Sequence, residues 1–254
     1  MACVLLPLPD EGFDVTEVAV PWWLLTRAGH EIVFCTEKGG SAPSADPLLL
    51  SGVVFGRLGA FPQARAFYRE LERDDAFQDP RSWNHVGAED FDGLLLPGGH
   101  APGTRQYLGS PRVQHLTRQF FERKSPVGAI CHGVLVAARS RDRATGRSVL
   151  YELDTTCLAK YQEFLGYAVT FWKLGRYYRT YYSYVEDEVR DALRDASRQF
   201  KRGPLTGAAR DSEIDSAPAF VVVDGNYVSA RWPGDAYTFS RTFQEVLEAS
   251  DANR

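Results

Sequence analysis

The sequence predicts an α/β fold with a mostly parallel sheet, and three observations support this. The chain opens with a strand at 3–7, a helix at 14–29 and a second strand at 31–36, within the length of one βαβ unit. A third apolar strand, 90–96, ends in a glycine pair. The apolar run 126–130 passes without a loop into a segment with helical character. Strands that alternate with helices in this way are typical of parallel sheets covered by helices.

The first helix has a recognisable start. Asp14 takes the N-cap position and Glu17 follows three residues later, as in a capping box. Val18, Trp22 and Leu25 then repeat at helical spacing. Glu17 therefore lies in the first turn, where its carboxyl either caps the helix or points toward whatever lies above the strand ends.

The middle of the chain combines irregular segments with helices. Residues 39–62 are rich in Gly, Ser and Pro and indicate an irregular excursion rather than a linker between domains. Apolar residues from 67 to 77 predict a charged amphipathic surface helix. The polar connection 82–85 packs as a loop or forms a pocket wall. Residues 113–121 predict a helix before the strand at 126–130.

The second half begins with an insert at about 151–202 that contains an aromatic-dense tract, 171–184. This tract packs against the main body or a second subunit, or covers residue 131 as a lid; the sequence leaves these alternatives open. Residues 219–230 predict a hairpin around Asp-Gly-Asn, and 239–247 predict the last helix.

Length, composition and net charge limit the classes of protein to which the chain can belong. The 254 residues, 44% of them hydrophobic, are expected to form one domain, 1–254, with inserts at about 39–62 and 151–202. A formal net charge of -4 and dispersed basic residues give no attraction to nucleic acid or to an anionic membrane. The amino terminus lacks a signal-like pattern, so we expect a cytoplasmic protein. The four cysteines include no CxxC pair, which argues against a disulfide scaffold or a zinc ribbon.

The most informative stretch surrounds Cys131. A buried strand that passes directly into a helix places Cys131 on a sharp turn, the arrangement of a nucleophile elbow. The helix dipole and its free N–H groups are expected to lower the pKa of this thiol. The alternative is an inert buried cysteine. Gly128, Gly133 and the titratable His132 favour a functional site, because an inert core position needs none of them.

A second candidate feature is the pair Gly98 and Gly99, followed by His100. At the carboxyl end of a buried strand, their backbone N–H groups could hold an oxyanion or carboxylate, although they could equally be turn residues. His85, His100 and a carboxylate could form a metal site, but no ligand spacing supports one. We therefore expect neither a metal nor a cofactor.

Taken together, these motifs resemble the DJ-1/PfpI superfamily, which shares the fold of class I glutamine amidotransferase domains. The resemblance depends on the segments 12–17, 21–30, 92–100 and 129–133, and extends to the closing hairpin. It implies a flavodoxin-like, doubly wound, mostly parallel sheet with helices on both faces and a helical, aromatic insert. The sequence is most similar to the branch of heat-shock chaperones with glyoxalase activity.

The resemblance also implies roles for individual residues. Cys131 takes the position of the reactive cysteine, Glu17 that of the carboxylic acid that hydrogen-bonds it, and His132 that of the histidine after it. The third acid of the triad varies between branches; we choose Glu163, with Asp154 second.

The substrate space is assigned by the same resemblance. The amides of Gly99 and His132 would form an oxyanion hole, and Gly98, His100 and Trp22 would line the space around it.

The activity that the resemblance implies is that of a glyoxalase III, which converts methylglyoxal to lactate without glutathione or metal, or of a related deglycase. The alternatives are an isonitrile hydratase or other cysteine hydrolase, and a non-enzymatic stress chaperone or redox sensor. Glutamine amidotransfer is disfavoured, because the chain has no spare length for a synthetase domain. We expect a small carbonyl substrate and a homodimer.

Overall fold

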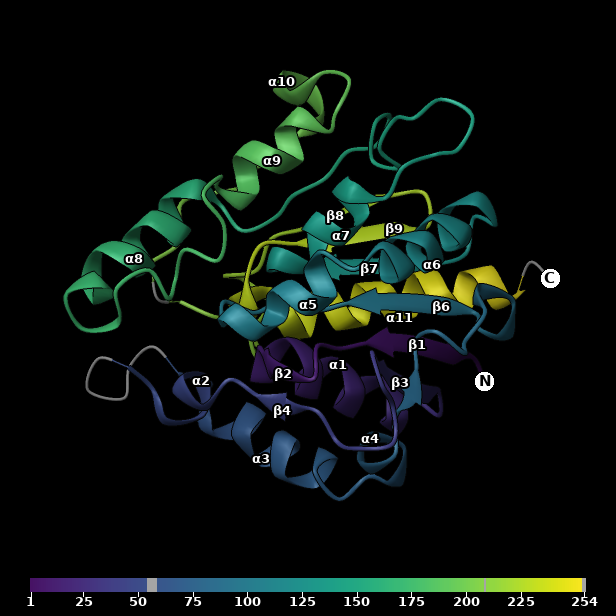
Figure 1. Cartoon of the computed structure of the whole chain (residues 1–254), viewed down its shortest axis with the longest axis horizontal. Helices are drawn as coiled ribbons and strands as arrows, with labels where there is room; N and C mark the ends of the chain where they lie inside the picture. The colour runs from purple at the N-terminus through teal and green to yellow at the C-terminus, as the bar shows by residue number, and fades with distance from the viewer. Residues whose placement is uncertain (54–58, 208, 253–254) are drawn as a thin grey trace.

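The computed structural model describes residues 1–53, 59–207 and 209–252. Its centre is a seven-stranded sheet in the order β5-β3-β1-β6-β7-β9-β8 (Figure 1). The strands are β1 (Cys3–Pro7), β3 (Glu31–Thr36), β5 (Arg81–Ser82), β6 (Gly93–Leu96), β7 (Val127–Ile130), β8 (Val221–Asp224) and β9 (Tyr227–Ala230). All neighbours pair in parallel except β8 and β9, which form the antiparallel hairpin at the edge. The predicted α/β class and mostly parallel sheet are confirmed.

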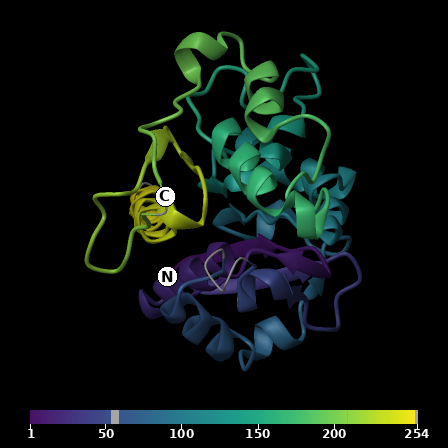
Figure 2. The same cartoon turned by 90° about the vertical axis from the view of Figure 1, so that its left-hand side faces the viewer.

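Helices lie on both faces of this sheet. On one face α1 (Val15–Arg27) packs beside α11 (Ala236–Ala252), and α11 reaches β6 and β7. On the other face lie α6 (Pro111–Glu122) and α7 (Val134–Arg139), which also contact each other. Figure 2 shows α11 nearly end-on, separated from the teal helices by the sheet. The expected doubly wound arrangement is therefore present.

Smaller elements complete the molecule. A second, two-stranded parallel sheet joins β2 (Glu11–Phe13) and β4 (Ser44–Ala45). The remaining α-helices are α2 (Pro47–Ser51), α3 (Pro62–Leu71), α4 (Asp75–Gln78), α5 (Arg105–Leu108), α8 (Lys160–Leu174), α9 (Val185–Asp191) and α10 (Ala196–Gln199). Single 3₁₀ turns are η1 (Ala88–Asp90), η2 (Pro102–Thr104), η3 (Cys131–Gly133) and η4 (Pro233–Asp235).

Two local predictions need correction. The single helix expected between 67 and 77 is wrong, because α3 ends at Leu71 and Asp74 caps a separate short helix, α4, by accepting from the Phe77 N–H. The excursion 39–62 is less irregular than expected, since it contains β4 and α2. Its residues 54–58 lie outside the described part of the chain.

The aromatic insert lies partly against the body. Tyr178 is buried and Thr180 donates its hydroxyl to the His100 carbonyl at 3.0 Å, whereas Trp172 and Tyr182 are exposed. The alternative that this tract packs on the main body therefore holds for Tyr178 and Thr180. Within the described ranges, no helix combines the length and the apolar character needed to cross a membrane.

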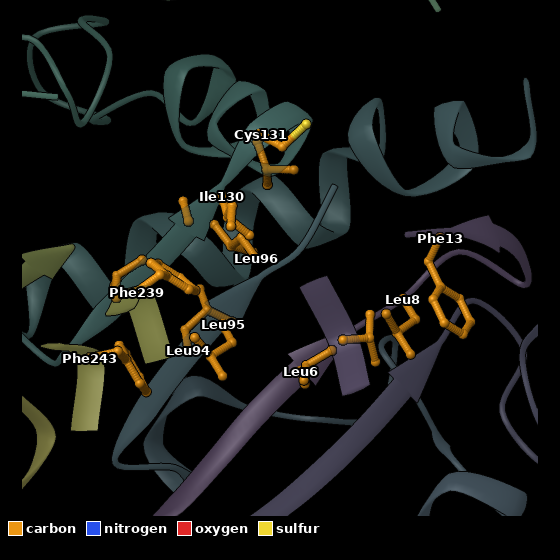
Figure 3. Close-up of a cluster of buried hydrophobic side chains, with 14 of the residues drawn as sticks. Leu6, Leu8, Phe13, Leu94, Leu95, Leu96, Ile130, Cys131, Phe239 and Phe243 are labelled. Carbon is orange, nitrogen blue, oxygen red and sulfur yellow. The ribbon is translucent and has the colours of Figure 1, made fainter. Parts of the chain in front are cut away.

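The core lies on the sheet and ends at the candidate site. Figure 3 shows Leu94, Leu95 and Leu96 of β6 packed between Phe239 and Phe243 of α11 on one side and the side chains of the β1 region on the other. Cys131 lies at the far end of this cluster, where the strands finish.

Candidate active site

Cys131 occupies a strained turn between β7 and α7. Strand β7 ends at Ile130, one 3₁₀ turn follows, and α7 begins at Val134. The Cys131 backbone has φ 58°, and among the described non-glycine residues only Lys124 shares a positive φ. Such a conformation costs on the order of 1–3 kcal/mol and is found preferentially at functional sites. The predicted nucleophile elbow is present in the geometry.

Glycines allow the ends of β6 and β7 to come together at this turn. A Cβ on Gly133 would lie 2.0 Å from the Leu96 carbonyl oxygen. A Cβ on Gly98 would lie 2.7 Å from the His132 nitrogen and 2.9 Å from Glu17 Oε2. No larger residue fits at either position without moving backbone.

Glu17 reaches this turn from the start of α1. Asp14 caps the helix, as expected, by accepting from the Thr16 and Glu17 N–H groups at 2.8 and 3.2 Å. The Glu17 carboxyl turns away from the cap, and its Oε2 accepts the Gly98 N–H at 2.7 Å. Of the two alternatives for Glu17, the structure therefore favours the carboxyl that faces the strand ends.

Cys131 and Glu17 form a buried acidic pair. Burial raises the pKa of the Cys131 thiol well above 9, and the Glu17 charge adds to this. Burial likewise raises the pKa of Glu17 well above its ordinary value of 4.5, helped by Asp14. The expectation of a lowered Cys131 pKa is wrong, because the Cys131 side chain is 1% exposed and this desolvation outweighs the His132 amide that points at the sulfur.

Two histidines lie close to the thiol. His132 Nδ1 is 3.6 Å from Cys131 Sγ, and the His132 ring is fully buried. Burial, followed by the charges of His100 and Arg139, lowers the pKa of His132 well below 6.5, so its imidazole is neutral at pH 7. The His100 ring stacks edge-on against it at 4.7 Å, and burial lowers the pKa of His100 to about 4.

The two glycines of the oxyanion prediction have different positions. The Gly98 amide is occupied by Glu17, and its carbonyl accepts the Asp14 N–H at 3.0 Å. Gly99 has φ 153° and packs so tightly that a Cβ would lie 2.8 Å from the Gly12 oxygen. No hydrogen bond of the Gly99 N–H to another described residue is present, so this amide can donate to an oxyanion.

Comparison with known proteins identifies the family. Residues 8–204 match the family described as ThiJ/PfpI family-like. The chain belongs to this ThiJ/PfpI-like family. The resemblance to the DJ-1/PfpI superfamily is thereby confirmed.

Relatives of this ThiJ/PfpI-like protein include several named deglycases. A deglycase of Pyrococcus abyssi is 26% identical over 246 residues, covering 96% of this chain and 99% of that protein. Protein/nucleic acid deglycase 2 of Escherichia coli is 48% identical over 127 residues, covering 50% and 58%. An uncharacterized protein of Schizosaccharomyces pombe is 32% identical over 120 residues, and the chain spans 44% of its length.

Solved structures support the flavodoxin-like fold. Glyoxalase III of Candida albicans matches with a TM-score of 0.69 at 19% identity, covering 98% of both chains. Rapid Encystment Protein 24 kDa of Francisella tularensis matches with a TM-score of 0.68 at 18% identity, covering 97% and 99%. At such identities the likeness concerns the fold alone.

The structure does not bring every candidate residue of this ThiJ/PfpI-like chain to Cys131. Glu163 Oε2 accepts the Val185 N–H at 3.0 Å, and its other oxygen pairs with Arg179 at 3.2 Å. Asp154 lies at the surface and pairs with Lys201 at 3.1 Å. Among the described contacts of these two acids, none involves His132, whose Nε2 has no hydrogen-bond partner in the described chain.

Trp22 is also remote from the reacting atoms. It lies on α1 five residues beyond Glu17, which is about 7.5 Å further along the helix axis. Its ring is 7% exposed and packs within the core beside Trp23. Helical spacing alone, which placed Trp22 on the apolar face, indicates a core residue here rather than a wall of the substrate space.

Two residues near the site were not foreseen. The Arg210 charge acts on both Asp14 and Glu17, and Tyr178 packs on His100 with their rings 5.0 Å apart. Arg210 lies in the connection between α10 and β8, and Tyr178 is one of several tyrosines in the insert. No local pattern in the sequence distinguishes either residue.

The geometry also offers possible metal ligands. One donor atom each from His100, Cys131 and His132 lies within 4.8 Å of the other two. Sulfur and imidazole nitrogen are ligands that zinc and copper accept. His85, which the sequence suggested as a ligand, is not part of this group.

Proposed function

We propose that this protein is an enzyme that uses Cys131 as a nucleophile on small reactive carbonyls, converting methylglyoxal to lactate without glutathione. The observation that carries the proposal is the meeting of three groups at one strand end. Cys131 lies there on its positive-φ turn, with a hydrogen bond to the Glu17 side chain and with His132 Nδ1 3.6 Å from the sulfur. The deglycase and glyoxalase III names among its relatives support an enzymatic role.

In the first step the Cys131 sulfur adds to the aldehyde carbon and forms a hemithioacetal. The C–S bond forms as the carbonyl π bond breaks, and the former carbonyl oxygen takes up a proton. Glu17 is suited to supply that proton, because burial raises the pKa of its carboxyl well above the ordinary value. The Gly99 and His132 amides would stabilise the developing oxyanion.

In the second step a hydrogen moves from the aldehyde carbon to the neighbouring carbon. His132 is suited to act as the base, because burial lowers its pKa and leaves the imidazole neutral. Opposite pKa shifts of Glu17 and His132 support the roles of acid and base that we propose for them. The resulting thioester of lactate is hydrolysed by water, which regenerates the thiol; methylglyoxal plus water equals lactic acid, so no oxidant is required.

The test is lactate formation from methylglyoxal in buffer without glutathione. We expect Cys131→Ala to lose at least about 10²-fold in turnover, because no other described group supplies a nucleophile at this position. The matched control is Cys157→Ala, which removes another buried thiol and should retain most of the turnover. Full lactate production by a folded Cys131→Ala variant would refute the proposal.

Deglycase action is the second candidate, favoured by the match to the Pyrococcus abyssi deglycase along nearly the full length of both chains. A panel of methylglyoxal, methylglyoxal adducts of arginine and cysteine, and an isocyanide distinguishes the reactions. Release of arginine from its adduct faster than hydrolysis of free methylglyoxal would favour the deglycase. Turnover of the isocyanide alone would favour a hydratase. Slow turnover of every compound together with ready oxidation of Cys131 to a sulfinic acid would favour a redox sensor.

A further inference from the structure

Helix α8 presents an apolar face on its outer side. Its buried residues are the polar Glu163 and Thr170. Glu163 is held by Val185 and Arg179, and the Thr170 hydroxyl donates to the Gly166 carbonyl at 2.6 Å. At 3.6 residues per turn, the opposite half of the helix is formed by uncharged and mostly large residues: Tyr161, Phe164, Leu165, Ala168, Val169, Phe171 and Trp172. This α8 face reverses the usual pattern, in which the apolar side of a surface helix is buried.

The α8 face is large and exposed. Figure 1 shows α8 at the margin of the molecule, beside α9 and away from the seven-stranded sheet. Phe164, Phe171 and Trp172 are 54%, 54% and 71% exposed. Because a large aromatic side chain buries about 150–250 Å², these three alone expose roughly 270–450 Å². Leu165 and Val169, which are also exposed, extend the patch.

This area matches what a stable dimer needs. A standard interface covers about 800 Å² on each partner, of which about 60% is apolar. Each partner therefore contributes about 480 Å² of apolar surface. The three aromatic residues of the α8 face, together with Leu165 and Val169, supply an area of this size. Exposed apolar patches as large as this are often functional.

Trp172 is the most exposed side chain of the α8 face. Its indole N–H donates to the Val169 carbonyl of the same helix at 3.0 Å. The polar group of the ring is therefore satisfied, and the ring is held in place while most of its surface remains in water. An aromatic ring that is already ordered loses little entropy when a partner covers it, and Trp is enriched among the residues that dominate binding energies.

A hollow lies at the other end of the same face. Its volume is about 330 Å³, which is enough to hold one aromatic side chain. The hollow is lined by Lys160, Tyr161, Phe164, Tyr184, Glu186 and Arg202. Lys160 and Arg202 are held in ion pairs with Asp187 and Glu186. The three aromatic rings are therefore the walls that suit an incoming apolar side chain.

We propose that the α8 face binds a second copy of this chain, with Trp172 of each copy in the hollow beside Phe164 of the other. The protruding ring and the hollow lie on the same helix face, so one two-fold rotation fills both hollows at once. The occupant is a second copy because the chain itself carries both halves of the contact. This inference concerns assembly and does not depend on the reaction at Cys131.

The geometry places the two-fold axis beside Ala168. This residue lies midway between Phe164 and Trp172, so an antiparallel pair of α8 helices that meets here brings Trp172 of one copy level with Phe164 of the other. Ala168 has the smallest side chain of the α8 face, which lets the two helix axes approach to about 8–10 Å. Because Cα atoms lie about 2.3 Å from a helix axis, two facing Ala168 Cα atoms come within about 3.5–5.5 Å.

A first experiment measures the dimer by sedimentation velocity of the full chain over a concentration series, without substrate. The wild type should be a dimer at micromolar concentration. We expect Trp172→Ser to raise the dimer Kd at least about 100-fold, because the ring is lost from two hollows per dimer. Its circular dichroism should match that of the wild type, since Trp172 is exposed within one copy. The matched control is Ile214→Ser, which removes another exposed apolar side chain and should keep the wild-type Kd.

Three outcomes of this experiment would refute the proposal. The first is a wild type that stays monomeric up to about 100 µM, a concentration at which an interface of this area should form. The second is a dimer whose Kd is unchanged in Trp172→Ser, which would assign the contact to another face. The third is a monomer that binds phosphatidylcholine vesicles through Trp172, which would assign the α8 face to lipid.

A second experiment tests the position of the axis. Under mild oxidation, Ala168→Cys should form a disulfide between two copies, because the facing Cα atoms lie within the range that a disulfide spans. The mass of the linked peptide pair that contains residue 168 identifies the bond. Lys173→Cys, an exposed position on the same helix but outside the α8 face, should not cross-link. Cross-linking of Lys173→Cys but not of Ala168→Cys would contradict the proposed contact.

Discussion

At Cys131 an uncommon backbone conformation coincides with an uncommon charge arrangement. The thiol and the Glu17 carboxyl are both buried, and burial raises the pKa of each. Two acids that are joined by a hydrogen bond, as these side chains are, ionise as a pair. The first negative charge is then shared between them. A thiolate therefore forms in this site only while Glu17 keeps its proton. The oxygen of the hemithioacetal needs that same proton.

Replacing Glu17 separates its effect on the pKa of the Cys131 thiol from its role as a proton donor. In Glu17→Gln we expect the pKa of the Cys131 thiol to fall, because burial still raises it but the carboxylate charge is gone. Turnover should nevertheless fall by about 10²–10⁴, since an amide cannot donate the proton. The pH dependence of Cys131 alkylation and the rate of lactate formation measure the two effects. Unchanged alkylation together with unchanged turnover would reduce Glu17 to a structural acceptor for the Gly98 amide.

At the scale of elements, the close approach of β6 and the turn after β7 builds the site. Gly133→Ala puts a Cβ 2.0 Å from the Leu96 oxygen, so we expect a loss of at least about 1–3 kcal/mol in the free energy of unfolding and a loss of turnover. The control is Gly166→Ala in the middle of α8, where a Cβ has its nearest contact at 3.7 Å from Tyr178. That change should stabilise the protein by about 0.5–1 kcal/mol. Urea unfolding of both variants measures these changes in unfolding free energy. Equal changes in the two variants would contradict the packing argument.

Glu163 tests how α8 and α9 are held together. Burial raises the pKa of Glu163 to about 7, although Val185 and Arg179 oppose this. A raised pKa means that its contribution to stability is full below pH 4.5 and is lost as the pH rises through 7. Relative to Glu163→Gln, the wild type should therefore lose about 3 kcal/mol of unfolding free energy across that window. Urea unfolding at several pH values measures this difference.

Turnover of Glu163→Gln provides the second readout. Because its carboxyl is occupied by Val185 and Arg179, this variant should keep most of its activity. A collapse of lactate formation without a change in stability would return Glu163 to the catalytic triad.

The sequence predicted those features that depend on local patterns. The strand-to-helix turn at Cys131, the Asp14 cap and the glycines beside them follow from neighbouring residues, and the structure contains all of them. The position of Glu163 depends on how the insert folds back, and a carboxylate in a helix gives no local sign of its partner. Arg210 and Tyr178 belong to segments 32 residues apart, and no periodicity in either segment indicates a position near the site.

At the scale of the whole molecule, the sheet order brings the site together. Strands β1, β6 and β7 are adjacent and parallel, so the loops after their carboxyl ends, together with the start of α1, meet at one edge. The loop that carries Arg210 is tied to the sheet by Arg231, which directly follows the carboxyl end of β9 at this same edge. This side chain is fully buried, pairs with Asp235 at 2.8 Å and donates to the Pro204 and Pro218 carbonyls.

Breaking the ion pair between Arg231 and Asp235 should destabilise the protein. Arg231→Met leaves the Asp235 charge buried without its cationic partner, so we expect a loss of about 3–5 kcal/mol in unfolding free energy. Combining it with Asp235→Asn removes that charge and should recover part of the loss. A double variant as unstable as Arg231→Met, or more so, would show that the loop contacts of Arg231, rather than the uncompensated charge, cause the effect.

The most direct test of the central claim is the mass of the Cys131 peptide after acid quench during turnover of methylglyoxal. The account predicts a peptide heavier by one methylglyoxal on Cys131, which forms and decays at the rate of lactate production and is absent from Cys131→Ala. Lactate formation with an unmodified Cys131 throughout, or an adduct that never decays while lactate accumulates, would contradict covalent catalysis by this sulfur.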